Sequence, residues 1–126
     1  MALLKHDEEY LISLGFEYII SEDNTGLFLV IKDYKLSPEY NQSKTNVLIK
    51  IPIGYPMVAI DMFFVNPHIR LASTNMNPPA TDGVLNSLGT EWQQFSRHYP
   101  WQPNYNLKTH IKMVDNVLTR GRWQCS

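Results

Sequence analysis

The sequence predicts a single α+β domain over residues 1–126, in which an antiparallel meander of four strands lies between an N-terminal and a C-terminal helix. Three observations lead to this prediction. The chain has 126 residues, which is the size of one domain. Apolar residues at helical spacing occur near its two ends. Between them, strand-like segments follow one another through short turns, which is typical of antiparallel sheets in α+β domains.

The first helix is expected at about Asp7–Leu14. Asp7 is a candidate N-cap residue, and two further acidic residues follow it in the first turn, where the helix dipole favours negative charge. Gly15 is expected to end this helix. A hairpin then follows, because two β-branched and aromatic segments, 16–20 and 27–31, flank the turn-forming residues 23–26.

The third and fourth strands are expected at Val47–Ile51 and Met62–Val65, with a turn at Gly54-Tyr55-Pro56 between them. Asp61, at the start of the fourth strand, is expected to bond locally or to backbone. From 66 to 105 no regular periodicity is visible. Because this segment contains large aromatic residues, among them Trp92, Phe95, Tyr99 and Trp101, we expect it to be ordered and functional rather than a plain connection.

The last helix is expected over 106–118. Its apolar residues are spaced four, three and four apart, which is a helical stripe, and Asn104 or Asn106 is expected to cap it. The stripe consists of Leu107, Ile111, Val114 and Leu118.

Composition excludes several classes of function. Eleven basic and twelve acidic residues give a net charge of −1, which argues against nucleic acid as a partner. The one cysteine, Cys125, permits neither an intrachain disulfide nor a cysteine-based zinc site. No apolar run approaches the roughly 20 residues of a membrane span. We therefore expect a cytoplasmic protein with no membrane partner, no metal and no cofactor.

Short motifs in the chain resemble landmarks of ubiquitin-conjugating enzymes. Tyr55-Pro56 resembles the Tyr-Pro of those enzymes, and Trp101-Gln102-Pro103 resembles their Trp-x-Pro. Asn66-Pro67-His68-Ile69 resembles their His-Pro-Asn-Ile, although the histidine here follows the proline. Finer details resemble the prokaryotic family E of conjugating-enzyme-like proteins over about residues 8–118. These details are Ile60 to Phe64, Trp92 to His98 followed by Trp101, and Leu107 to His110.

The resemblance implies the conjugating-enzyme fold and a place in a bacterial ubiquitin-like modification pathway. The implied partners are a ubiquitin-like protein and an activating enzyme, and the implied activity is of the transferase type. Conjugating enzymes hold the modifier on a cysteine, but no cysteine lies between Asn66 and Trp101. Cys125 follows the last predicted helix, and we expect it not to be the acceptor.

Without that cysteine, two alternatives remain open. In the first, a hydroxyl holds the modifier as an oxyester: Ser87 is the first candidate and Thr90 the second, with His98 as the general base that a hydroxyl requires. In the second, both hydroxyls are ordinary surface groups and the protein is a non-catalytic binding module of the same pathway. Candidate binding residues are Ser96, Arg97, Trp92 and Trp101, because an arginine can bind a partner's carboxylate and tryptophans can line a contact. The alternative is a structural role, in which Arg97 and His98 hold their own loop in place and Trp92 and Trp101 are core residues rather than contact residues.

Overall fold

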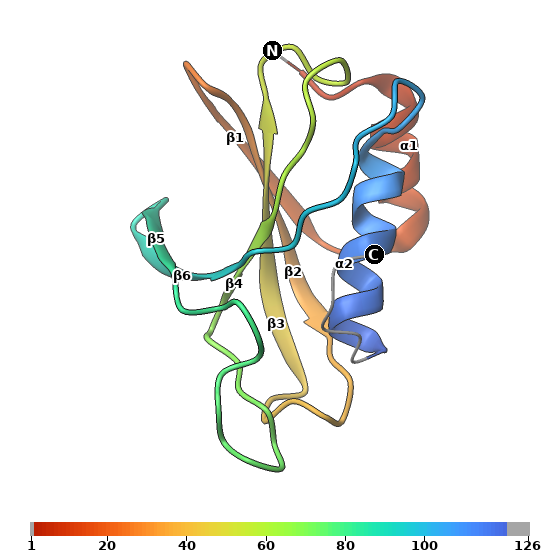
Figure 1. Ribbon diagram of the computed structural model, residues 1–126. Helices are drawn as coiled ribbons and strands as arrows, with labels where there is room; N and C mark the ends of the chain where they lie inside the picture. The colour runs from red at the N-terminus through yellow and green to blue at the C-terminus, as the bar shows by residue number, and fades with distance from the viewer. Residues whose placement is uncertain (1, 121–126) are drawn as a thin grey trace.

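Residues 2–120, which the computed structural model describes, form two helices and six strands (Figure 1). This arrangement confirms the α+β class, but the sheet has six strands rather than the expected four. It is consistent with the conjugating-enzyme fold. In chain order the elements are α1 (Lys5–Leu14), β1 (Tyr18–Asp23), β2 (Gly26–Lys35), β3 (Lys44–Pro52), β4 (Phe63–Asn66), β5 (Val84–Ser87), β6 (Thr90–Phe95) and α2 (Leu107–Thr119).

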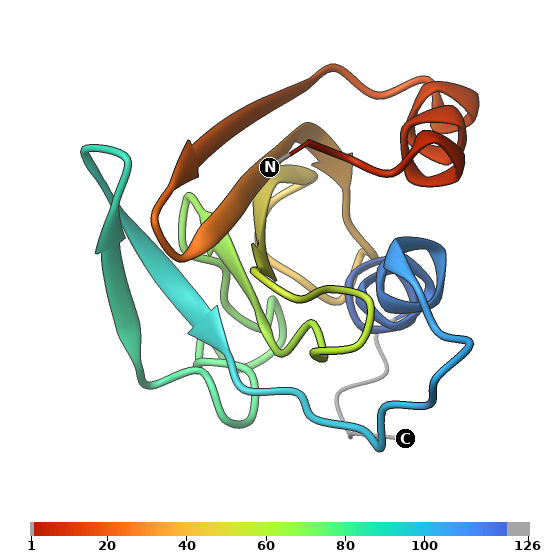
Figure 2. The same ribbon diagram turned by 90° about the horizontal axis from the view of Figure 1, so that it is seen from above.

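The six strands form one antiparallel sheet in the order β1-β2-β3-β4-β6-β5. The first four are consecutive neighbours, as the meander prediction required. The chain then makes a long excursion and returns as β6 beside β4, where Phe63 pairs with Phe95. Seen from above, the sheet is curved and both helices lie on the same side of it (Figure 2).

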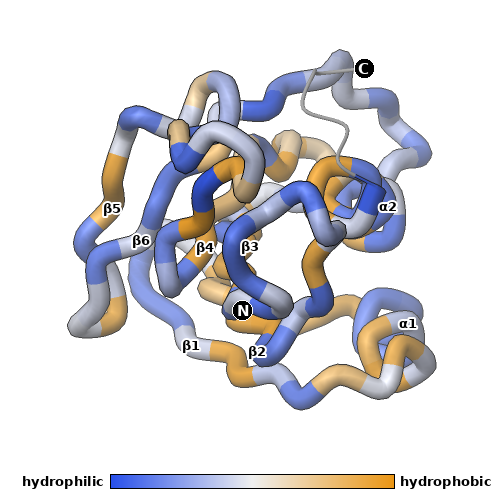
Figure 3. Tube along the Cα trace, turned by 90° about the horizontal axis from the view of Figure 1, so that it is seen from below, coloured by the Kyte–Doolittle hydropathy of each residue, from blue (hydrophilic) through white to orange (hydrophobic). Residues whose placement is uncertain are grey.

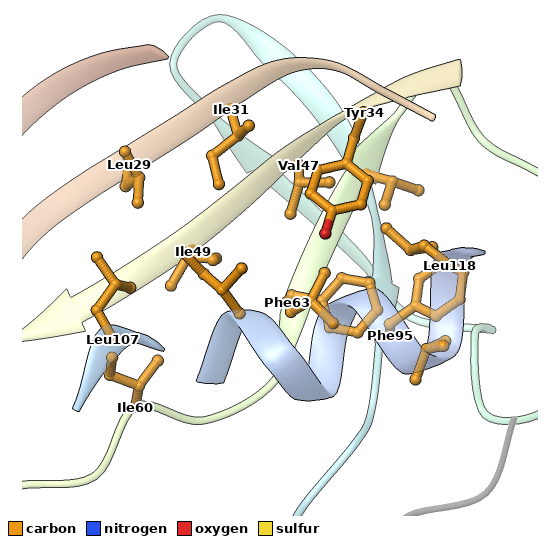
Figure 4. Packing of buried hydrophobic residues seen from close by; sticks show 14 of the residues in the cluster. Leu29, Ile31, Tyr34, Val47, Ile49, Ile60, Phe63, Phe95, Leu107 and Leu118 are labelled. Carbon is orange, nitrogen blue, oxygen red and sulfur yellow. The ribbon is translucent and has the colours of Figure 1, made fainter. Parts of the chain in front are cut away.

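The main core lies between the sheet and α2 (Figure 4). Successive side chains of a strand point to opposite faces, so alternate residues of β2 and β3, such as Leu29 and Ile49, face the helix. The predicted stripe of α2 meets them, and all four of its members are buried. Asn106 caps α2, because its side chain accepts a hydrogen bond from the Thr109 amide. Side chains on the opposite face of the sheet form a smaller cluster, which consists of Phe28 from β2, Leu48 from β3, Phe64 from β4 and Trp92 from β6.

Tyr55 joins the two helices. Its hydroxyl donates to Asp7 Oδ2 of α1 at 2.7 Å and accepts from the Leu107 amide of α2 at 2.6 Å. The expectation that Asp7 caps α1 is wrong, because the helix begins at Lys5 and the carboxylate is buried against Tyr55 instead. Burial raises the pKa of the Tyr55 hydroxyl, and the hydrogen bond to Asp7 raises it further.

The segment 66–105 contains regular structure that its sequence does not indicate. Strands β5 and β6 form a hairpin whose two turn residues, Leu88 and Gly89, have φ angles of 54° and 71°. Two positive φ angles in a two-residue turn are the geometry of a type I′ hairpin. The hairpin lies at the edge of the sheet, away from the helices (Figure 2), and includes hydrophobic stretches (Figure 3). The expectation of an irregular segment is therefore wrong for residues 84–95.

Candidate functional site

A carboxylate–histidine pair lies just before β4. His98 Nδ1 is 2.7 Å from Asp61 Oδ1, and the side chains are 59% and 57% exposed. An ionised carboxylate can only accept, so the Nδ1–H of His98 donates to Asp61. The pair joins the segment that enters β4 to the segment that leaves β6. The expectation that Asp61 bonds locally is wrong, since its partner is 37 residues away in sequence.

The next residue, Met62, is held by a second histidine. Its backbone has a φ of 59°, which is uncommon for a residue with a long side chain. The Met62 carbonyl lies 2.8 Å from His110 Nε2, and Tyr99 Oη lies 2.7 Å from His110 Nδ1. A carbonyl only accepts, so Nε2 bears the proton and Nδ1 accepts from the Tyr99 hydroxyl.

Burial is complete for His110 and fixes its charge. The imidazole is 0% exposed, and this desolvation lowers its pKa to about 4. His110 is therefore neutral at cellular pH, as the hydrogen bonds require. Burial also raises the pKa of Tyr99, and the Asp61 carboxylate contributes to that rise. The two histidines thus form hydrogen bonds with adjacent residues: His98 with the Asp61 side chain and His110 with the Met62 carbonyl. An unusual backbone conformation held by surrounding groups is a frequent property of functional sites.

The structure places Ser87 and Thr90 elsewhere. They pair with each other across the β5–β6 turn, while His98 follows the opposite end of β6. Thr90 and Phe95 are five positions apart on one strand, which spans roughly 16 Å at ~3.3 Å per residue. A general base has to lie about 3 Å from the proton it removes. The structure therefore does not bring the two candidate acceptors together with their candidate base.

The four candidate binding residues are mostly internal. Arg97 is 1% exposed and lies over the Phe95 ring, 5.3 Å from its centroid. Trp92 is buried in the smaller cluster and donates from Nε1 to the Ser87 carbonyl. Ser96 is half-buried, and its hydroxyl accepts from Gln94 Nε2. Trp101 donates from Nε1 to the Pro56 carbonyl, so two of the family-like landmarks contact each other.

Sequence reasoning found His98 but missed the groups around it. Asp61 interrupts an apolar segment and is the signal that could have been used, because an acidic residue at such a position is a candidate partner for a titratable side chain elsewhere. The pair of His110 and half-buried Tyr99 left no signal, since Tyr99 lies in the loop before α2, eleven residues from His110. Cys125 lies outside the described residues. Within residues 2–120 no group of His, Cys, Asp and Glu is arranged to bind a metal ion, and no helix is long and apolar enough to cross a membrane.

Comparison with known proteins identifies a family. A family model described as Prokaryotic E2 family E, where E2 denotes a ubiquitin-conjugating enzyme, matches residues 3–121. No curated protein and no solved structure matches the chain. Families of this kind interact in general with ubiquitin-like proteins and activating enzymes. The match spans both helices and all six strands of the described residues. The chain therefore belongs to prokaryotic E2 family E, which suggests that it is a component of ubiquitin-like conjugation.

Proposed function

We propose that this protein is a binding component of a prokaryotic ubiquitin-like conjugation pathway, one that binds a ubiquitin-like protein and its activating enzyme without holding the modifier covalently. One observation supports the non-covalent role more than any other. The candidate acceptors Ser87 and Thr90 lie at the turn of the β5–β6 hairpin, and the candidate base His98 lies beyond the other end of β6. A hydroxyl is essentially never ionised at neutral pH, so without a nearby base it is a poor acceptor.

A second candidate function is oxyester formation on Thr90 or Ser87. The observation that favours it is the position of Thr90, which lines a groove of about 280 Å³ on the outer face of the sheet. In this reaction the hydroxyl oxygen attacks the thioester carbonyl on the activating enzyme, the thiolate leaves, and the hydroxyl proton passes to a base. That base would come from the partner, because His98 is too far from the turn.

The test is an incubation with the activating enzyme, ATP and the ubiquitin-like protein. Intact mass is measured with and without thiol reductant and with alkali, and complex formation is measured by co-elution. We expect a complex and no adduct. Matched variants locate any adduct: Thr90→Val, Ser87→Ala and Cys125→Ser.

Each other result points to a different conclusion. An adduct that resists reductant, yields to alkali and disappears in Thr90→Val or Ser87→Ala would replace the binding role with oxyester transfer. A reductant-sensitive adduct lost in Cys125→Ser would restore a thioester mechanism. If neither an adduct nor a complex forms, the proposal fails. Arg97→Ala is tested for complex formation, and its melting temperature is measured as well. The Arg97 side chain is buried, so its removal lowers the stability of the fold in addition to any effect on binding.

A further inference from the structure

The outer edge of β5 is one of the two edges of the sheet. β5 is the last strand in the sheet order, and no described element lies beside its outer edge (Figure 1, Figure 2). The backbone groups of a strand face its neighbour and the opposite side in alternation. The Gly83 carbonyl accepts from the Gln94 amide of β6, so the backbone groups of Val84 and Asn86 face outward. Within residues 2–120 these outward N–H and C=O groups have no hydrogen-bond partner.

The edge of β5 lacks the features by which proteins prevent one sheet edge from pairing with another. Such features include charged residues, prolines and bulges. Residues 83–90 contain no charged residue and no proline, and the β5–β6 register has no bulge. Val84 is 51% exposed. The other edge strand, β1, ends in Glu22 and Asp23 and follows Glu17, so that edge is protected by charge.

We infer that β5 pairs with β5 of a second copy of this chain, about a two-fold axis beside Leu85. This inference goes beyond the proposed function and does not depend on it. A two-fold contact requires a self-complementary surface. In the antiparallel register that joins the outward groups, Val84 pairs with Asn86 of the second copy through an N–H···O bond in each direction. Leu85 then faces Leu85 of the second copy at a non-hydrogen-bonded position, where side chains lie closest.

The packing and charge of β5 fit a second copy. Leu85 is half-buried against the small cluster on the outer face, so two facing leucines join the small clusters of both copies. The nearest charged residue before β5, Asp82, falls opposite the uncharged turn of the second copy. On β1, the two-fold register that pairs all of residues 17–23 places Asp23 opposite Glu17 of the second copy. Like charges directly opposite each other are destabilising, so β5 is the favoured edge.

The pairing involves a strand of four residues from each copy, so the dimer is weak. Because so short an edge buries less area than a standard interface, we expect a dissociation constant on the order of 100 µM. Sedimentation velocity of the full chain from about 10 µM to about 1 mM measures this constant. The weight-average mass should rise from that of one chain toward that of two, without larger species, because a two-fold contact closes on itself.

Charged variants test the register. Val84→Lys and Asn86→Glu each place two like charges diagonally across the axis, and we expect each to weaken association about fivefold. In the double variant Val84→Lys/Asn86→Glu, each lysine lies opposite a glutamate of the second copy, so association should return at least to the wild-type level. Ile20→Lys is the matched control, because Ile20 is an exposed apolar residue of the other edge strand, and it should associate like the wild type.

A second kind of variant tests the backbone contact. Asn86→Pro removes the outward N–H of residue 86 and leaves the bonds between β5 and β6 in place, so it should keep the chain monomeric. Melting temperatures establish that all variants fold. Each of the following outcomes overturns the inference: a wild-type chain that stays monomeric at about 1 mM, species larger than two chains, no recovery in the double variant, undiminished association in Asn86→Pro, or a loss in Ile20→Lys equal to that in Val84→Lys.

Discussion

Individual polar side chains connect parts of this fold that are distant in sequence. The Tyr55 hydroxyl contacts residues 48 and 52 positions away, and the His110 imidazole contacts a carbonyl 48 positions away. Each of these hydrogen bonds satisfies a polar group that folding removes from water. Without the bond, that group would be buried without a partner, which costs free energy. Substitution at either position therefore tests how much of the stability depends on one contact.

Tyr55→Phe removes the hydroxyl that joins the helices. We expect a loss of about 2–3 kcal/mol in the free energy of unfolding, because the buried Asp7 carboxylate loses its donor and the Leu107 amide loses its acceptor. Urea unfolding measures the change. Tyr105→Phe is the control, since Tyr105 contacts Tyr99 and Trp101 through its ring. An equal effect in both variants would contradict the role assigned to the Tyr55 hydroxyl.

His110 predicts a specific pH dependence of stability. Its pKa is about 4 in the folded protein and about 6.5 in the unfolded chain. Above about pH 6.5 neither state binds the proton, and the full stability is present. As the pH falls from about 6.5 towards 4, the unfolded chain binds the proton and the folded protein does not, so stability is lost. The difference corresponds to about 3 kcal/mol.

The variant His110→Gln isolates this effect from the other titrating groups. A glutamine amide can donate to the Met62 carbonyl and accept from Tyr99, but it does not titrate. We expect the variant to lose less stability than the wild type between about pH 7 and about pH 4.5. The measurement is urea unfolding at a series of pH values. Parallel curves for the two proteins would show that His110 does not titrate as its burial implies.

At the scale of elements, the β5–β6 hairpin shows where prediction from sequence stops. The earlier hairpin is visible because Asp23-Asn24-Thr25-Gly26 is a turn sequence between apolar segments. The later one turns at Leu88-Gly89, and leucine is a poor residue for a positive φ. The sequence of β5 is also short and partly polar. The local sequence therefore gives no turn signal. The hairpin is part of the sheet because β6 pairs with β4 and β5 pairs with β6.

Leu88→Asn should stabilise the hairpin. Asparagine tolerates a positive φ better than leucine, and Leu88 is 47% exposed, so little apolar burial is lost. We expect a gain of about 0.5–1 kcal/mol in the free energy of unfolding. Val84→Asn, an exposed residue of β5 with ordinary backbone, is the comparison and should give no gain. A loss of stability in Leu88→Asn would mean that the leucine side chain contributes more than its backbone costs.

The candidate site was also predictable only in part, because the distances between its residues depend on the course of the strands and not on spacing in the sequence. His98 is recognisable as a titratable side chain among aromatic residues, but its distance from Ser87 and Thr90 depends on the direction of β6. Spacing in sequence placed these groups eleven or fewer residues apart. An extended strand turned that short spacing into a separation that no hydrogen bond can span.

At the scale of the whole molecule, the curved sheet has two unequal cores. Ile49 and Leu48 are neighbours on β3 and are both 0% exposed, but Ile49 belongs to the large cluster under α2 and Leu48 to the small cluster on the other face. Their alanine variants compare the two. We expect losses within about 2–5 kcal/mol, larger for Ile49→Ala, because the small cluster is less enclosed and can relax into the cavity. Thermal unfolding of both variants checks the order.

The Asp7–Tyr55–Leu107 bridge has a consequence for how the chain acquires its structure during synthesis. α1 leaves the ribosome first, yet Oδ2 of its buried Asp7 accepts a hydrogen bond from a side chain in the middle of the chain, which itself accepts one from the first amide of the last helix. The three parts become available in the order of translation, so the N-terminal helix cannot reach its final environment until residue 107 has emerged. The last helix therefore completes the packing of the first, and the nascent chain keeps part of its apolar surface exposed until almost all of the domain has been made.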